Sequence, residues 1–441
     1  MLPRFERPVL LDSGAAELLG DVRSLMELEA AEFTALLGQP LILDSAEVGR
    51  ATDALMVRVD PTISSARLEA DLVDRRVLMT IADPAQMGSG FNLLHSLAHE
   101  SALVVSDSEV DTCPEVYDRI RAEVGNIYPS FALRGLDWDG ICERHAHLRE
   151  VGGDEQFWNG ALRWIAELGD AHTQLVRPGR RHHPPYLARM GPESATLVSV
   201  PDDSAAWDAG VRPGDHLIVD DGQHWLDTVG ASPQHHELVA GRRFMMMTTP
   251  TRQFTAHIRS GTPRTWTEQA TTRDSVVVNG PMITIRHFTP EVPHLLRAAL
   301  GLLRGRTDTV TLDLRGNTGG NLVAAAESRR LFAHDDGWFG TVAFTTGRGT
   351  LAEPAPLSLA RAADAWTGRL QVLVDAVTYS AAEDFLHPLV GQPGIRIGGG
   401  PTGVGSGRPH TRALKDGVRL AVSTAITYMR DGRPIEYHGI T

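Results

Sequence analysis

One stretch near the C-terminal end, VLVDAVTYSAAEDF over residues 372–385, constrains the fold more than any other. The apolar run Val372–Val374 predicts a buried strand, and apolar residues recur with helical spacing from Ala382 onward. The chain must therefore turn from strand to helix at Ser380, where unpaired N–H groups and the positive end of the helix dipole favour a developing anion. This position suits a nucleophilic serine, although a helix N-cap is the simpler interpretation of one isolated serine.

Composition is that of a globular protein. A length of 441 residues is enough for several domains, and a formal net charge of −13 argues against nucleic acid as the partner. The sequence holds no run of 18 or more apolar residues, so we expect no membrane span. The first residues lack the pattern of a signal peptide, which leads us to expect a cytoplasmic protein.

The cysteines and histidines give no metal-binding pattern. Cys113 and Cys142 lack a paired spacing, and neither needs to be bridged. His95 and His99 lie four residues apart beside Glu100, but they lack the HExxH order of a helical zinc site. We therefore expect no metal and no cofactor.

The first half of the chain contains an N-terminal domain, residues 1–112, to which no function is assigned. Residues 113–185 form a predominantly helical segment, in which Asp137 and Asp154 are predicted helix N-caps. The last of these helices ends at the sequence LGDAHT, which puts His172 just past a helix end. Considered alone, such a histidine is more often a solvated or capping residue than a catalytic one.

A basic, proline-rich connector, RPGRRHHPP, then marks a domain boundary. The sequence AGVRPGDHLIVDDG dominates the next domain, residues 186–270, and a final domain, residues 271–441, alternates strands and helices. Its glycine-rich turn Asn317–Asn321 follows a strand and precedes a helix. The turn lacks the spacing of phosphate-binding loops, but its backbone N–H groups could form an oxyanion hole.

Four stretches, LGDAHT, AGVRPGDHLIVDDG, TLDLRGNTGG and DAVTYSAAEDF, occur in the order and approximate spacing of the tail-specific, or C-terminal-processing, serine peptidases. The resemblance covers residues 114–441. It implies an α/β fold with a crotonase-like (ClpP/crotonase) catalytic core, a helical N-terminal part and a PDZ-like inserted domain over residues 186–270. Domains of that kind commonly bind a peptide as an added strand, and the alternative here is a structural lid.

The resemblance also implies roles for individual residues. Ser380 corresponds to the nucleophile of the family. The backbone N–H groups of Gly319 or Gly320, together with that of Ala381, correspond to its oxyanion hole.

The family divides by the group that activates the serine. One branch carries a lysine about 25 residues after it, but the matching stretch here, residues 402–406, has Val404 in the middle and no lysine. The chain's only lysine, Lys415, falls in a predicted hairpin turn, where it should be solvated and protonated at neutral pH, with a pKa of ~10.4.

The other branch, which includes the tricorn core protease and the retinoid-binding repeats of photoreceptors, uses a histidine. By this resemblance His172 is the base and Glu436 the carboxylate that supports it. Asp170 is a second candidate carboxylate or a turn cap. Ala171 departs from the branch, which carries a serine there. An imidazole, with a pKa of ~6.5, is a competent base near neutrality.

The predicted function is that of a serine peptidase-like hydrolase acting on peptides, including their C-termini, through a Ser-His-Glu site and an acyl-enzyme. Two alternatives stay open: ester hydrolysis or acyl transfer on a small molecule, and binding of a hydrophobic ligand on the same fold. The predicted partner is a peptide or protein substrate, and not nucleic acid or a membrane. A second copy of the chain is a further candidate partner.

Overall fold

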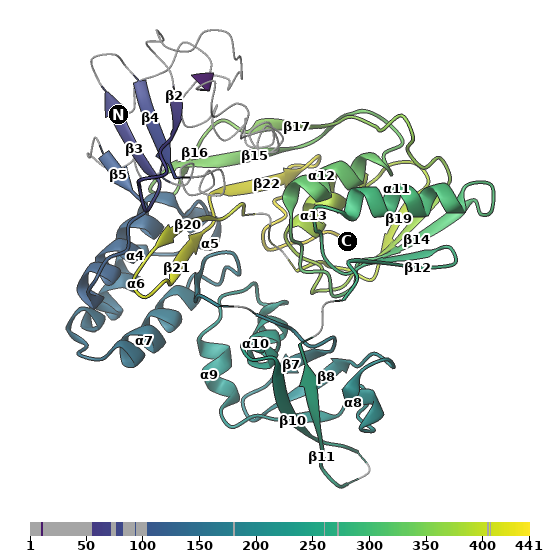
Figure 1. The fold of residues 1–441 in the computed structure, drawn as a ribbon, viewed down its shortest axis with the longest axis horizontal. Coiled ribbons are helices and arrows are strands. Elements are labelled where there is room, and N and C mark those ends of the chain that lie inside the picture. The colour runs from purple at the N-terminus through teal and green to yellow at the C-terminus, as the bar shows by residue number, and fades with distance from the viewer. Residues whose placement is uncertain are drawn as a thin grey trace.

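The structure is a computed structural model, shown in Figure 1, that describes residues 10–11, 55–71, 76–82, 93, 104–179, 181–259, 261–270, 273–403, 405 and 407–441. His95, His99 and Glu100 lie outside the described residues. Within the described part, no helix is long and apolar enough to span a membrane, and no group of three or more metal-ligating side chains is present.

A small sheet lies at the N-terminal end of the chain, seen at the top left of Figure 1. Its strand order is β1-β2-β4-β3-β5. The strands are β1 (Leu10–Leu11), β2 (Leu55–Val59), β3 (Arg67–Asp71), β4 (Arg76–Ile81) and β5 (Val104–Ser106).

A helical region follows, which packs around one aromatic stack. Its helices are α4 (Cys113–Ile127), α5 (Phe131–Arg134), α6 (Trp138–Arg144), η2 (Ala146–Glu150) and α7 (Asp154–Ala166). The indole of Trp164 stacks on Tyr117 and Trp138, with ring centroids 4.6 Å and 5.4 Å apart. This stack buries the faces that the helices turn toward one another.

One of the two predicted N-caps is confirmed. Asp137 caps α6 by accepting a hydrogen bond from the N–H of Gly140. The prediction for Asp154 is wrong, because Gly153 is the N-cap of α7. The Asp154 carboxylate instead accepts a hydrogen bond from Lys415 Nζ, 2.6 Å away, and this partner lies too far along the chain to appear in a local pattern.

A separate sheet with its own core follows, at the bottom of Figure 1. Its strand order is β11-β10-β9-β8-β7. The elements are β7 (Leu187–Met190), β8 (Ser194–Ser199), α8 (Ala205–Asp208), β9 (His216–Ile218), α9 (Gly222–Asp227), α10 (His236–Met245), β10 (Thr251–His257) and β11 (Arg264–Gln269). Met245 and Met247 are buried in this core.

The C-terminal part is a mixed α/β unit. Its main sheet has the order β12-β13-β14-β18-β19, in which β13, β14, β18 and β19 are parallel. These elements are β12 (Val276–Asn279), β13 (Met282–Ile285), α11 (Val292–Leu303), β14 (Thr309–Asp313), α12 (Leu322–Arg330), β18 (Arg369–Leu373), α13 (Ala381–Leu386), η3 (His387–Leu389) and β19 (Ile395–Gly398). A second sheet contains β15 (Gly337–Gly347), β16 (Thr350–Leu351), β17 (Ala355–Leu359) and β22 (Ala425–Met429).

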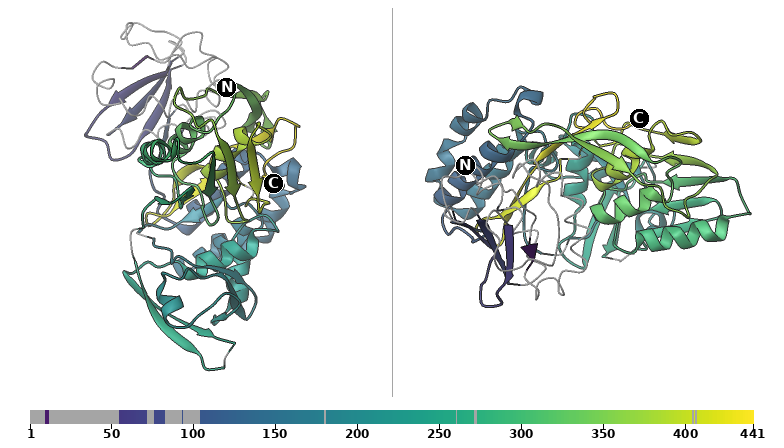
Figure 2. Two further views of the ribbon diagram at one scale, coloured as in Figure 1. Left: turned by 90° about the vertical axis from the view of Figure 1, so that its right-hand side faces the viewer. Right: turned by 90° about the horizontal axis from the view of Figure 1, so that it is seen from above.

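One hairpin joins the C-terminal part to the helical region. Strands β20 (His410–Ala413) and β21 (Arg419–Val422) pair with each other, and β21 also pairs with β6 (Gln174–Val176). Figures 1 and 2 show this hairpin lying against the helices. Leu420 is fully buried in the helical core. Strand β6 begins two residues after His172, so this pairing carries His172 toward the α/β unit.

We expect Leu420→Ala to lower the free energy of unfolding by about 2–5 kcal/mol, because it leaves a cavity at the junction. Urea denaturation followed by circular dichroism measures this change. Leu302→Ala is the matched control, since its side chain is 62% exposed and the change should stay within about 0.5 kcal/mol. Equal losses of unfolding free energy in both variants would contradict the claim that this hairpin joins the two regions.

Candidate active site

Ser380 has a strained backbone. Its φ of 59° and ψ of −125° lie in a region that non-glycine residues rarely adopt. Two hydrogen bonds hold the turn: the N–H of Tyr379 donates to the carbonyl of Asn317 (2.9 Å), and the N–H of Ser380 donates to the carboxylate of Glu383 (3.1 Å). The strain turns the chain abruptly into α13 and leaves the half-buried Ser380 at the helix start.

The glycine-rich turn lies directly against the serine turn, because their parallel strands β14 and β18 end side by side. A Cβ at Gly319 would lie 2.7 Å from the backbone nitrogen of Ala381, and one at Gly320 would lie 2.3 Å from the carbonyl oxygen of Phe288. Both residues also have positive φ, of 93° and 129°. Only glycine allows this approach.

The backbone N–H of Gly319 is already used, since it donates to Asn317 Oδ1 at 2.8 Å. Within the described part of the chain, the N–H groups of Gly320 and Ala381 donate no hydrogen bond. Of the two predicted alternatives at the glycine turn, Gly320 therefore has the available donor.

The carboxylate of Asp170 fixes the loop that carries His172. Asp170 Oδ1 accepts the backbone N–H of His172 (2.9 Å), and its Oδ2 accepts the hydroxyls of Thr173 (2.9 Å) and Ser423 (2.7 Å). Burial opposes ionisation of Asp170, but Arg134 and His172 lower its pKa below the usual value. Asp170 thus holds the backbone of the histidine loop to the end of β21.

The imidazole of His172 reaches the serine, 208 residues along the chain. Its Nε2 lies 2.9 Å from Ser380 Oγ. Its Nδ1 lies 2.8 Å from Tyr379 Oη, and the two rings also stack with centroids 4.5 Å apart. The ring is 7% exposed. Both nitrogens therefore have defined partners in a site largely closed to water.

Burial controls the ionisation of this ring. Desolvation lowers the pKa of His172 to about 4, although the nearby charge of Asp170 acts in the opposite direction. The imidazole is therefore neutral at pH 7 and able to accept a proton.

Glu436 lies near the site and is linked to it through neighbouring residues. Its carboxylate accepts the backbone N–H of Thr427 at 3.2 Å. It lines a small polar cavity together with Asp170, Arg134 and Ser423. Burial raises the pKa of Tyr379 well above 10, and the charges of Asp170 and Glu436 add to that effect. The hydrogen-bond partner of His172 Nδ1 is the phenol of Tyr379.

Sequence reasoning missed three residues of the site. Tyr379 carried no signal, because its role depends on contact with a distant histidine. His235, from the sheet region of residues 187–269, also stacks on Tyr379, with centroids 5.3 Å apart. Glu383 is fully buried and accepts N–H groups from Ser380 and Gly405. The S-x-x-E spacing of a capping box was a signal for Glu383.

Lys415 is engaged elsewhere. Its ammonium pairs with Asp154 (2.6 Å) and Asp416 (2.9 Å), and the hydrogen bonds that it donates to these carboxylates raise its pKa. A protonated, paired lysine cannot act as a base for Ser380.

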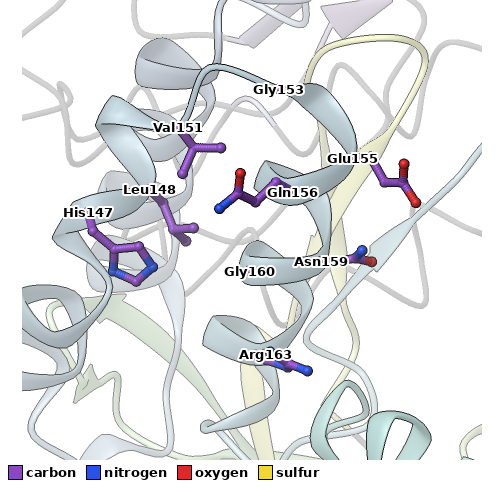
Figure 3. A pocket seen from close by; sticks show the side chains of 9 residues that line it. All are labelled: His147, Leu148, Val151, Gly153, Glu155, Gln156, Asn159, Gly160 and Arg163. Carbon is purple, nitrogen blue, oxygen red and sulfur yellow. The ribbon is translucent and has the colours of Figure 1, made fainter. Parts of the chain in front are cut away.

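A hollow of about 560 Å³ lies between η2 and α7, and Figure 3 shows the side chains around it. It is lined by His147, Leu148, Val151, Gly153, Glu155, Gln156, Asn159, Gly160 and Arg163. None of these is a predicted site residue, so the hollow is separate from the candidate active site.

The reaction rate of Ser380 with a fluorophosphonate should rise with pH through a midpoint near 4, because the neutral imidazole is the reactive form. Labelling kinetics between pH 3.5 and 8 measure this midpoint. Since the unfolded histidine has a pKa of ~6.5, acidification below that value also weakens folding. Circular dichroism at each pH separates the two effects. A midpoint of the labelling rate at pH 6.5 would contradict the claim that His172 is a desolvated base.

Gly405→Ala should slow labelling by about 100-fold, because its Cβ would lie 2.4 Å from Tyr379 Oη and displace the phenol. Gly301→Ala is the control, since nothing lies within 4 Å of a Cβ there. Labelling of the Gly405 variant at the wild-type rate would show that the phenol does not position His172.

Comparisons with known proteins found a matching family model and similar folds. Residues 281–441 match the model of peptidase family S41. The photosystem II D1 C-terminal processing protease is similar, with a TM-score of 0.54 and 17% identity over 75% of this chain and 92% of that chain. Mature CPAF complexed with lactacystin gives a TM-score of 0.57 and 12% identity over 74% and 92%. A comparison with curated proteins found no match. The predicted resemblance to C-terminal-processing serine peptidases is confirmed, and residues 281–441 of this chain are similar to peptidase family S41.

Proposed function

We propose that this chain is a serine peptidase that cleaves peptides through an acyl-enzyme on Ser380. The observation that carries the proposal is the 2.9 Å contact between His172 Nε2 and Ser380 Oγ at a strained strand-to-helix turn. A serine that served only as a helix N-cap would need neither contact with a histidine nor a strained backbone.

The proposed reaction follows from the contacts around the serine. His172 Nε2 takes the proton from Ser380 Oγ as Oγ bonds to the substrate carbonyl carbon. The N–H groups of Gly320 and Ala381 stabilise the oxyanion. His172 then gives the proton to the leaving amine as the C–N bond breaks. Water, deprotonated by the same imidazole, releases the acyl group.

Tyr379 is proposed to orient the base. In the tautomer that this reaction requires, Nδ1–H donates to Tyr379 Oη, since Nε2 must accept from Ser380. The raised pKa of Tyr379 keeps the phenol neutral. Glu436, predicted as the supporting carboxylate, would act on the imidazole through its charge beside the phenol.

The remaining parts of the predicted architecture stay proposals. The four parallel strands of the main sheet support a crotonase-like core, and the five-stranded sheet of residues 187–269 supports a PDZ-like unit. Helix α10 packs directly on edge strand β7, where a Cβ at Gly241 would lie 2.1 Å from the carbonyl oxygen of Ala188. This contact and the stacking of His235 on Tyr379 favour a structural lid over a strand-binding domain. The cytoplasmic location and a homo-oligomer stay predictions.

Ser380→Ala and His172→Ala should each lower hydrolysis of casein by about 10⁴-fold or more, and the double variant should lose little further, because the two groups act as one unit. The readouts are release of labelled casein fragments and fluorophosphonate labelling detected by intact mass. Lys415→Met is the control and should keep nearly full activity.

Three outcomes would contradict the proposal or narrow it. A Lys415 variant as inactive as the Ser380 variant would restore a lysine mechanism. Labelling without cleavage of casein or an unstructured peptide, combined with hydrolysis of p-nitrophenyl acetate, would favour the small-molecule esterase. The absence of any adduct on the folded protein would favour a binding protein.

A further inference from the structure

A cluster of cationic side chains lies where the connector of residues 177–185 meets the end of α10. His182 and Met247 join these segments by two backbone hydrogen bonds of 2.9 Å and 2.8 Å. The cluster, which we call the basic corner, consists of Arg177, Arg181, Arg242 and Arg243.

The basic corner has no counterion within the described part of the chain. Among the described residues, the side chains of its arginines make one hydrogen bond, from Arg181 Nη2 to the carbonyl of Arg177, and no ion pair reaches any of the four. Burial lowers the pKa of Arg243, and the charges of Arg181 and Arg177 add to that effect. By contrast, Arg189 on the neighbouring strand β7 pairs with Glu237 at 2.9 Å.

Such a cluster is unusual in a chain whose formal net charge is −13. Like charges brought together without a partner destabilise the folded protein unless an anion binds them. Arginine binds carboxylates through charge-assisted hydrogen bonds.

The basic corner is close to the proposed catalytic residues. Arg243 lines the same small cavity as Ala171 and Thr173, the two neighbours of His172. Arg177 follows strand β6 and lies five residues beyond His172. At ~3.3 Å per extended residue, this stretch spans at most about 16 Å. An extended peptide bound at Ser380 can therefore reach the corner within about five residues.

We propose that the basic corner binds acidic side chains of the peptide substrate, several residues from the bond that Ser380 cleaves. This inference rests on the proposed peptidase function for the identity of the ligand. A peptide fits better than nucleic acid, because the protein carries a formal net charge of −13.

The test measures peptide binding to the full-length Ser380→Ala variant by fluorescence anisotropy. One probe is a fluorescein-labelled dodecapeptide of alternating Ala and Glu with an amidated C-terminus. The second has Gln in place of Glu, and the third is the Gln peptide with a free C-terminal carboxylate. We expect the Glu peptide to bind at least about 10-fold more tightly than either Gln peptide at 50 mM salt, and to weaken as salt rises.

Adding Arg181→Gln and Arg243→Gln together should remove this preference, and adding Arg189→Gln should not. The Arg181/Arg243 variant should keep the circular dichroism spectrum of its parent, which shows that it is folded. Equal binding of Glu and Gln peptides would overturn the proposal. The proposal would also be overturned if the Gln peptide with a free C-terminal carboxylate bound more tightly than the Glu peptide. Tighter binding of a (dT)12 oligonucleotide than of the Glu peptide would overturn it as well.

The two proposals fail in different ways. If wild-type protein labels on Ser380 but shows no preference for Glu, only the basic-corner proposal is wrong. If wild-type protein does not label at all, the peptidase proposal is wrong, whatever the peptides do.

Discussion

The pairing of β6 with β21 is the contact on which the site depends, because it joins the segment after His172 to the unit that holds Ser380. Asp170 completes the joint with three hydrogen bonds to His172, Thr173 and Ser423. The two reactive groups lie 208 residues apart in the sequence, so neither region alone can form the site. The stability of this joint therefore sets how precisely Nε2 meets Oγ.

The other half of the site is built from backbone. Parallel strands β14 and β18 end together, so the glycine-rich turn and the serine turn press against each other. Asn317 ties them by accepting the N–H of Gly319 on its side chain and that of Tyr379 on its carbonyl. The strain at Ser380 is stabilised by these contacts, which are local to the turns and available before any substrate binds.

Much of this architecture could be predicted from the sequence, because its signals are local. The strand, turn and helix around Ser380 follow from apolar spacing, and the LGDAHT motif identified the histidine. Other features required tertiary contacts. The partner of Asp154 is Lys415, 261 residues away, and the phenol at His172 Nδ1 belongs to a residue whose sequence context predicts only a turn. The bond from Gly319 to Asn317 had a local signal, since asparagine often accepts the N–H two residues on.

The central claim is that His172 and Ser380 form one catalytic unit with an oxyanion hole at Gly320 and Ala381. A crystal structure of the protein after reaction with a fluorophosphonate tests it most directly. The account predicts phosphorus bonded to Ser380 Oγ, a phosphonyl oxygen hydrogen-bonded to the N–H groups of Gly320 and Ala381, and His172 Nε2 adjacent to the adduct. An adduct on another residue, or an imidazole turned away from Ser380, would contradict it.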